Sequence, residues 1–440
     1  MEGSVKYFMN LSYYFKHGLT FILILGSSIL LGTLFIIGVY FLPVSPMKEN
    51  VARSSAIFDY EGVYPQLVQG YKSSQLDNCT DAIMLGTAIY PGKGEGYIER
   101  AILGERIEYN SENPVQSLND YVNNVAGKAE LEQISGYARY WHGYLLFLKP
   151  LLIFFDYGDI RYLNMFLQFI ILTWLCLIII SKNRQRMMIP FICFFFVLNP
   201  MVLMLSLQYT SVYYIMLISV IIILKKDDWL VSKKGGYFLL FEIIGMATSY
   251  FDFLTYPAIT LGIPLTIAIL LDSRNKVDGK IFKVIKLSLS WGLGYAGMWC
   301  GKWLVSSILL HRNFFADAIE QIFLRTSMET EGQSISWFMV VWRNLKVILK
   351  WPYLILAGII FIWFTVAIFK YGINFGKREM FLDLIPYLII AAIPLGWYLA
   401  MGNHSYEHYW YTYRELGISC FAVLAWAVQV PCKMLGHRIA

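Results

Sequence analysis

Long apolar runs alternate with short polar segments along most of the chain. The first run, residues 21–42, is long enough to cross a bilayer, because a transmembrane helix needs about 20 consecutive apolar residues. The further runs that we interpret as spans lie at residues 162–181, 187–205, 210–224, 237–249, 254–271, 287–309, 352–369, 384–401 and 416–434. We therefore predict an all-α polytopic membrane protein with about ten transmembrane helices, in which residues 1–440 form a single transmembrane domain.

Two apolar runs allow a second interpretation. Residues 21–42 are longer than the core of a signal peptide, and the following "PVSPMKEN" contains no small-residue cleavage site, so we predict a retained span. The run at residues 143–155 is too short to cross a bilayer, and Lys149 and Pro150 interrupt it. We predict that this run forms an interfacial or re-entrant helix.

Lysine and arginine indicate the orientation, because short loops rich in these residues stay in the cytoplasm. If the N-terminus is inside, alternation of the spans places the short basic loops on the cytoplasmic side, at residues 182–186, 225–234, 272–286 and 370–378. We predict a multi-pass protein of the cell membrane with both termini in the cytoplasm. Two longer segments then lie outside: residues 43–159, which carry interfacial helices, and residues 310–350.

The composition agrees with this topology, since 57% of the residues are hydrophobic and only 15% are charged. The formal net charge of +6 comes largely from the basic loops. It indicates contact with anionic lipid head groups and not with nucleic acid. The chain also lacks the GxxxxGK motif, followed by Ser or Thr, of nucleotide-phosphate loops.

The first outside segment carries four carboxylates of interest, Asp59, Glu61, Asp77 and Asp81. Asp77 and Asp81 are four residues apart and would share one face of a helix. Ordinary N-capping explains either residue equally well. Clustered at a membrane surface, these carboxylates could instead act as a general base or bind a divalent cation such as Mg²⁺ or Mn²⁺. The sequence specifies no other cofactor.

The end of the same segment combines cations with aromatic rings. Arg139, Tyr140, Trp141 and His142 directly precede the run at residues 143–155. An aromatic belt with an arginine on lipid phosphates is one interpretation. The other is a substrate site, in which Tyr140 or Trp141 stacks on a sugar and Arg139 and His142 contact a phosphate.

Two ionisable residues lie in or between predicted spans. Lys302 falls in the outer half of the span at residues 287–309, where a charge is costly and therefore a candidate for function. It either snorkels to the interface or binds an anion such as a phosphate. Asp252 lies at the outer turn between two spans, where a turn-forming aspartate is the alternative to a site residue.

The segment "GNHSYEHYWYTYRELG", residues 402–417, gathers titratable and aromatic residues between the last two predicted spans. In a helix, His404 and His408 would line one face and Arg414 another. The histidine spacing also occurs in zinc sites, but the HExxH order is absent, so we predict no metal ligand here. Three arginines in the second outside segment, Arg312, Arg325 and Arg343, lie among apolar residues, and the sequence singles out none of them.

The candidate residues all fall on the predicted extracytoplasmic side, whereas the inner halves of the spans are nearly free of ionisable groups. A transporter would place polar residues along a path through the membrane. This distribution predicts a site at the outer face. We expect a first-segment acid there to share an outward cavity with Lys302 or Arg414.

Five strings carry a family resemblance: "LDNCTDAIML", "RYWHGYLLFLKPLLIFFDYGDIRYLN", "TSYFDFLTYP", "GYAGMWCGKW" and "NHSYEHYWYTYR". With a first span followed by a long acidic outside loop, the chain resembles GT-C-type membrane glycosyltransferases. Its strings are also similar to those of polytopic membrane proteins of Gram-positive bacteria. The resemblance implies transfer of a sugar from a polyprenyl-phosphate carrier to a glycan, lipid or protein acceptor in the bacterial cell envelope.

The resemblance also implies residue roles. Asp59 or Glu61 matches the acid of the family's first loop, and Asp77 and Asp81 are rivals for the role of base. Lys302, together with Arg139 and Arg414, would hold the phosphate. No adjacent Asp-Glu pair begins the loop, so the identity of the base stays open. A lipid or glycan transporter of the flippase type is the alternative function, and a non-catalytic scaffold is a third.

Overall fold

The computed structural model describes residues 2–108, 113–123, 133–135, 137–371 and 378–429. It is largely helical, as the sequence predicts. Two short antiparallel pairs are its strands in the described residues: β1 (Arg106–Glu108) with β2 (Gln133–Ser135), and β3 (Glu329–Thr330) with β4 (Gln333–Ser334). Neither pair is part of a larger sheet.

Five helical segments of the described chain are long and apolar enough to cross a membrane. They belong to α1 (Glu2–Val39), α8 (Tyr157–Ser181), α11 (Thr210–Ser232) with the turn before it, α17 (Trp351–Tyr371), and α18 (Arg378–Ala391) with α19 (Ile393–Ala400). Several such segments in one chain indicate a multi-pass membrane protein.

The other predicted spans are helical but shorter, broken or more polar. Predicted span 187–205 consists of α9 (Met188–Leu198) and α10 (Pro200–Leu205), because Asn199 has a left-handed backbone and Pro200 follows it. The remaining helices are α12 (Gly236–Phe251), α13 (Ile259–Leu270), α14 (Val277–Leu310) and α22 (Leu416–Ala427). Residues 430–434 of the last predicted span lie outside the described residues.

The short run at residues 143–155 forms α7 (Leu145–Phe154), a helix of ten residues. This length is about half of what a span requires. Lys149 is buried within it, and its Nζ donates to the carbonyl oxygen of Ala88 at 2.6 Å. The helix is therefore packed into the protein, in agreement with the prediction that it does not span.

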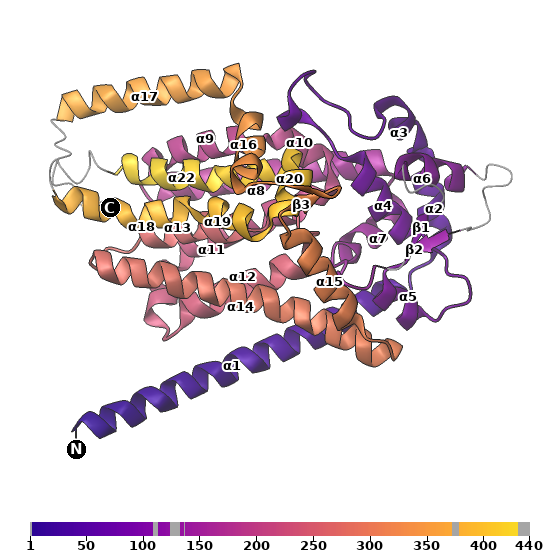
Figure 1. Ribbon diagram of the computed structural model, residues 1–440, viewed down its shortest axis with the longest axis horizontal. Helices are drawn as coiled ribbons and strands as arrows, with labels where there is room; N and C mark the ends of the chain where they lie inside the picture. Colours follow the sequence, from indigo (N-terminus) through magenta and orange to yellow (C-terminus); the bar gives the residue numbers. More distant parts are fainter. Residues whose placement is uncertain (1, 109–112, 124–132, 136, 372–377, 430–440) are drawn as a thin grey trace.

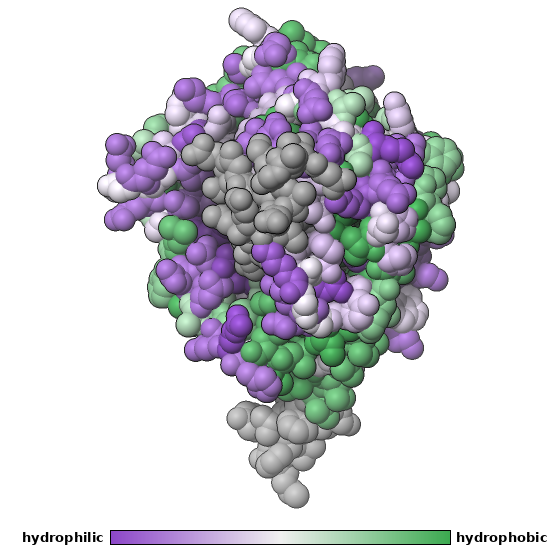
Figure 2. Space-filling model, turned by 90° about the vertical axis from the view of Figure 1, so that its right-hand side faces the viewer, coloured by the Kyte–Doolittle hydropathy of each residue, from purple (hydrophilic) through white to green (hydrophobic). Residues whose placement is uncertain are grey.

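The elements of the first outside segment gather at one end of the bundle, on the right of Figure 1. They are α2 (Val44–Arg53), α3 (Ser55–Glu61), α4 (Asn78–Ala88), α5 (Tyr97–Leu103) and α6 (Pro114–Val122). They share an apolar core with α7 and the end of α1, separate from the main core of the bundle. Seen from this end, hydrophilic residues cover much of the surface, with hydrophobic residues toward its edges (Figure 2). We call these elements the cap.

Two further groups of helices join the cap end. Residues 310–350, the second segment predicted to lie outside, contain α15 (Phe314–Thr326) and α16 (Trp337–Ile348). They pack against the C-terminal segment, which forms the short helices α20 (Gly402–Glu407) and α21 (Tyr409–Thr412). Three regions that are remote in sequence thus meet at one end of the molecule.

Candidate functional site

His404 of α20 connects two other parts of the protein. Its Nδ1 lies 2.9 Å from an NH of Arg325 in α15, and its Nε2 lies 2.7 Å from the carbonyl oxygen of Leu254. The ring is buried, and burial, helped by the charges of His408 and Arg325, holds the pKa of His404 well below its ordinary value. His404 is therefore a neutral ring beside a cation.

Asp77 is the N-cap of α4 and only 2% exposed. Its Oδ1 accepts a hydrogen bond from the backbone N–H of Thr80 at 2.9 Å, so the capping role suggested by the sequence is real. Its Oδ2 faces the indole N–H of Trp410 at 3.5 Å. Burial raises the pKa of Asp77, although hydrogen bonds to Thr80, Gln208 and Trp410 oppose this effect. The contact between Oδ2 and Trp410 is thus a long one.

Tyr411 packs against both histidines of the C-terminal segment. Its ring stacks on His408 with a centroid distance of 5.3 Å, and His408 lies 4.8 Å from the ring of His404. Burial raises the pKa of the Tyr411 phenol, and the charges of Asp77 and Arg325 also act on it. We call Asp77, Arg325, His404, His408 and Tyr411 the central cluster.

His408 is half-buried, as is Arg325. Its Nδ1 has no hydrogen-bond partner in the described part of the chain. Burial and the nearby Arg325 lower its pKa to about 4. At neutral pH the ring is therefore uncharged, and its Nδ1 is a buried nitrogen without a partner among the described residues.

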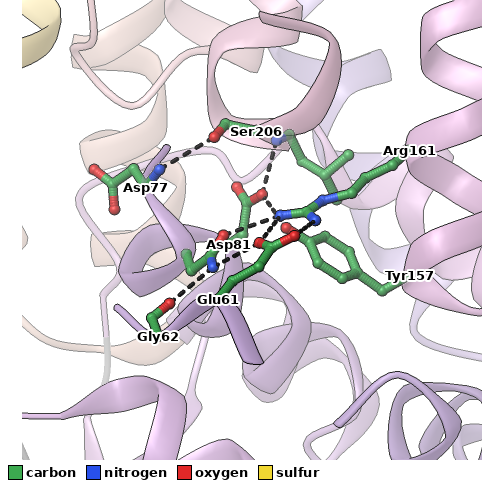
Figure 3. A network of polar contacts seen from close by, with 9 residues as sticks. Glu61, Gly62, Asp77, Asp81, Tyr157, Arg161 and Ser206 are labelled. Atoms are coloured by element: carbon green, nitrogen blue, oxygen red, sulfur yellow. Dashed lines mark hydrogen bonds and ion pairs between the residues drawn. The ribbon is translucent and has the colours of Figure 1, made fainter. Parts of the chain in front are cut away.

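Asp81 and Glu61 belong to a network of polar contacts within the cap and against the bundle (Figure 3). Asp77 joins this network through its backbone N–H, which donates to the Ser206 hydroxyl at 3.1 Å. Asp81 is fully buried and accepts hydrogen bonds from the Tyr157 hydroxyl at 2.6 Å and from the backbone N–H groups of Leu207 and Gln208 at 2.9 and 3.1 Å. It therefore caps the turn that begins α11. Burial raises the pKa of Asp81 to about 6.

Glu61 forms an ion pair with Arg161 of α8. The two guanidinium nitrogens lie 2.7 and 3.0 Å from its carboxylate oxygens, and Asn78 donates to the same carboxylate at 2.9 Å. A carboxylate that already accepts three hydrogen bonds is poorly suited to remove a proton from a substrate. These contacts favour structural roles for both Glu61 and Asp81.

Asp59, the fourth predicted acid, lies away from both groups. It is exposed near the end of α3, where the side chain of Asn119 donates to it at 2.6 Å. The four acids thus differ in their contacts: Asp59 lies on the cap surface, Glu61 and Asp81 each accept three hydrogen bonds, and Asp77 caps α4 with one oxygen toward Trp410.

The cationic and aromatic residues before α7 pack against α14 and α15. Arg139 pairs with Asp317 of α15 at 2.8 Å, and Tyr140 stacks on Tyr137 at 4.9 Å. Trp141 is buried and donates to the carbonyl oxygen of Met298 at 2.8 Å. Burial also lowers the pKa of His142 to about 3. These side chains join elements together, and they do not lie open as a sugar platform.

Lys302 and Arg414 are both fully buried. Nζ of Lys302 donates to the carbonyl oxygen of Ile102 in α5 at 2.8 Å, and Nε of Arg414 donates to the carbonyl oxygen of Leu198 at 3.0 Å. Asp252 accepts from the backbone N–H of Thr255 at 3.0 Å, which is the turn role considered above. None of the three makes a direct contact with the central cluster that the structure records.

Two cavities open at the surface. One of about 470 Å³ lies between the cap, α16 and the C-terminal segment, and an apolar one of about 590 Å³ lies beside α7, α8 and α11. None of the predicted site residues lines either cavity, so the expected shared cavity with Lys302 or Arg414 is not among them. Within the described residues, no group of three His, Cys, Asp or Glu side chains is placed to hold a metal ion.

Sequence reasoning placed Asp77, His404 and His408 on the same side of the membrane. In the structure Asp77 faces Trp410, whose ring lies 5.3 Å from that of His408. Sequence reasoning did not select Arg325, which supplies the cation of the central cluster. The available signal was a basic residue near the end of an otherwise amphipathic helix, and Arg312 and Arg343 carry similar signals. No protein-family model, curated protein sequence or solved structure matches this chain.

Proposed function

We propose that the protein is a GT-C-like integral membrane glycosyltransferase with about ten spans and both termini in the cytoplasm. It moves a sugar from a polyprenyl-phosphate carrier to a glycan, lipid or protein acceptor at the outer face of the cell membrane. The observation that supports this proposal best is the environment of Asp77. It is a buried carboxylate with a raised pKa beside the ring of Trp410. The charges of Asp77 and of Arg325 both act on the phenol of Tyr411.

The chemistry requires a base and a cation. The acceptor hydroxyl attacks the anomeric carbon, its proton passes to Asp77, and the bond from that carbon to the phosphate oxygen breaks. A raised pKa makes a carboxylate a better base near neutral pH. Arg325 stabilises the charge on the departing lipid phosphate. Trp410 and Tyr411 provide aromatic faces for the sugar, and the unpartnered Nδ1 of His408 accepts a hydrogen bond that a sugar hydroxyl donates.

The placement of buried charges supports an enzyme over a transporter. Arg161 contacts Glu61 of the cap, and Lys302 contacts Ile102 of the cap, so both of these helix-borne cations lie at the cap end. A transporter needs polar groups along a path that crosses the membrane. A reaction at one face needs them only at that face.

The test is transfer from a radiolabelled polyprenyl-phosphate sugar in proteoliposomes that contain the full chain. Asp77→Asn keeps an N-cap, because Asn caps helices as well as Asp does, but removes the base. We expect transfer to fall by about 10²- to 10⁴-fold. Asp59→Asn is the matched control on the exposed cap surface and keeps full transfer. Full transfer by Asp77→Asn overturns the assignment of the base. Movement of the labelled lipid across the bilayer without transfer establishes the transporter instead.

A further inference from the structure

The cavity of about 470 Å³ is lined by three segments that are remote in the sequence. Lys72 comes from the connection between α3 and α4 of the cap. Arg343 and Lys346 come from α16, Lys350 follows it, and Tyr406 and Tyr409 come from the C-terminal segment. Four of the ten lining residues are cationic and none is acidic. An excess of cations in one hollow indicates an anionic ligand.

The cations on α16 and just after it have no acidic partner in the described part of the chain. Among the described residues, Arg343, Lys346 and Lys350 form no ion pair. The guanidinium group of Arg343 lies over the rings of Tyr406 and Tyr409, at 4.1 and 4.5 Å from their centroids. Stacking of this kind holds the plane of the guanidinium group and leaves its N–H edge free for an oxyanion.

The wall of the cavity is held in place by buried polar contacts. Asn344, one residue after Arg343, is fully buried and donates to the carbonyl oxygen of Ser405 at 2.9 Å. Its side-chain oxygen accepts from the hydroxyl of Thr412 at 2.7 Å. These contacts attach α16 to the C-terminal segment on the side opposite its exposed residues, so the cations of α16 and the two tyrosines are held in register.

The opposite side of α16 suits a membrane interface. Trp337, Phe338, Met339 and Trp342 are 40%, 69%, 43% and 42% exposed, whereas Val340 and Val347 are buried. Exposed aromatic residues beside cations are typical of helices that lie at the level of lipid head groups. Met339 and Trp342 also line the cavity, so it opens next to this apolar face.

We propose that this cavity binds a phosphate group carried by a membrane lipid. The cations contact the phosphate oxygens, with Arg343 able to bind two of them, and the apolar face of α16 contacts the chains. Neither a carboxylate nor an imidazole lines the cavity, so it binds and does not react. The lipid is an anionic phospholipid or a polyprenyl phosphate. In the second case the inference rests on the proposed function and gives its donor a binding site.

The experiment is native mass spectrometry of the full chain in detergent, with added phosphatidylglycerol, polyprenyl phosphate or uncharged diacylglycerol as probes. We expect both phosphate lipids to be retained over diacylglycerol, and R343Q/K346Q to weaken their binding by about 10- to 100-fold. R53Q/R312Q removes two exposed cations outside the cavity and leaves binding unchanged. K346Q/K350Q changes only exposed side chains. If R343Q/K346Q does not fold, we expect K346Q/K350Q to weaken the binding of both phosphate lipids in its place.

Preference for phosphatidylglycerol assigns the cavity to bulk phospholipid, and preference for polyprenyl phosphate assigns it to the donor. Equal retention of diacylglycerol overturns the proposal, and so does an equal loss of binding in R53Q/R312Q. Binding is measured without turnover, so its failure is distinct from a failure of the transfer assay. Asp77 does not line the cavity. We therefore expect the Asp77→Asn variant to keep lipid binding even where it loses transfer.

Discussion

Arg325 and His404, 79 residues apart in the chain, lie 2.9 Å apart at NH1 and Nδ1. A guanidinium group can only donate, so Nδ1 accepts, and the proton on Nε2 is donated to the carbonyl oxygen of Leu254 at 2.7 Å. This arrangement selects one neutral tautomer. It also holds the cation of the central cluster against the C-terminal segment.

Replacing Arg325 tests whether this cation takes part in transfer. We expect Arg325→Gln to lower transfer by about 10²- to 10³-fold, because it removes the charge that faces the departing phosphate. Arg325→Lys keeps the charge and retains part of the activity. Transfer in proteoliposomes checks this, with the exposed Arg312→Gln as the matched control. If Arg325→Gln transfers at the normal rate, the contact with His404 only holds α15 in place.

The ion pair between Arg161 and Glu61 predicts a non-additive effect on stability. Their side chains are 7% and 22% exposed, so removing one charge leaves the other poorly solvated. We expect Arg161→Met to lower the free energy of unfolding by about 3 kcal/mol. Adding Glu61→Gln to that variant recovers part of the loss. Thermal unfolding in detergent measures both variants, and strictly additive losses contradict a coupled pair.

Asp81 predicts a dependence of stability on pH. Burial raises its pKa from 3.8 to about 6, so in the window between these values the folded state binds more protons than the unfolded state. The contribution of Asp81 to the free energy of unfolding is fully present below about pH 4 and is lost as the pH rises through 6. The total loss is about 3 kcal/mol. We expect the free energy of unfolding to fall over this window.

The control for this pH effect is Asp81→Asn, which cannot ionise and flattens the slope. Asp252 also has a pKa raised to about 6 by burial, so Asp252→Asn removes a second, separate part of the slope. Chemical unfolding at a series of pH values measures the effect. A slope that is the same in Asp81→Asn and in the unchanged protein contradicts a raised pKa at Asp81.

Replacing Lys302 distinguishes a structural role from the phosphate-binding role that the sequence suggested. It is fully buried and its recorded hydrogen bond goes to the carbonyl oxygen of Ile102. We expect Lys302→Met to lower the free energy of unfolding by about 1–3 kcal/mol, because the carbonyl loses its donor. Transfer per folded molecule should not change. A tenfold loss of transfer in correctly folded Lys302→Met restores the phosphate-binding role.

The hydrophobic pattern was sufficient for much of the fold. It predicted the long helices, and the interruption by Lys149 and Pro150 predicted that α7 would be short. It did not place the break at Asn199 inside predicted span 187–205, although an Asn-Pro pair is a local signal for such a break. These features depend on residues close together in the chain, so the sequence contains the information.

The acids show what the sequence alone left open. Asp77 and Asp81 are four residues apart on one helix and carry the same local signals. Asp81 is saturated by donors from Tyr157, Leu207 and Gln208, whereas Asp77 faces Trp410 across 333 positions of sequence. Only the packing of distant segments decided which carboxylate is committed to structure.

By itself, the sequence determined the helices, the polar end of the molecule and the residue types gathered there, because burial of apolar side chains and spacing along a helix are local properties. The tertiary structure decided which of those residues meet: Arg325 with His404, Glu61 with Arg161, and Arg343 with Tyr406 and Tyr409. Hydrogen bonds and ion pairs act over a few ångströms, so their energies depend on partners that only the folded chain brings within reach.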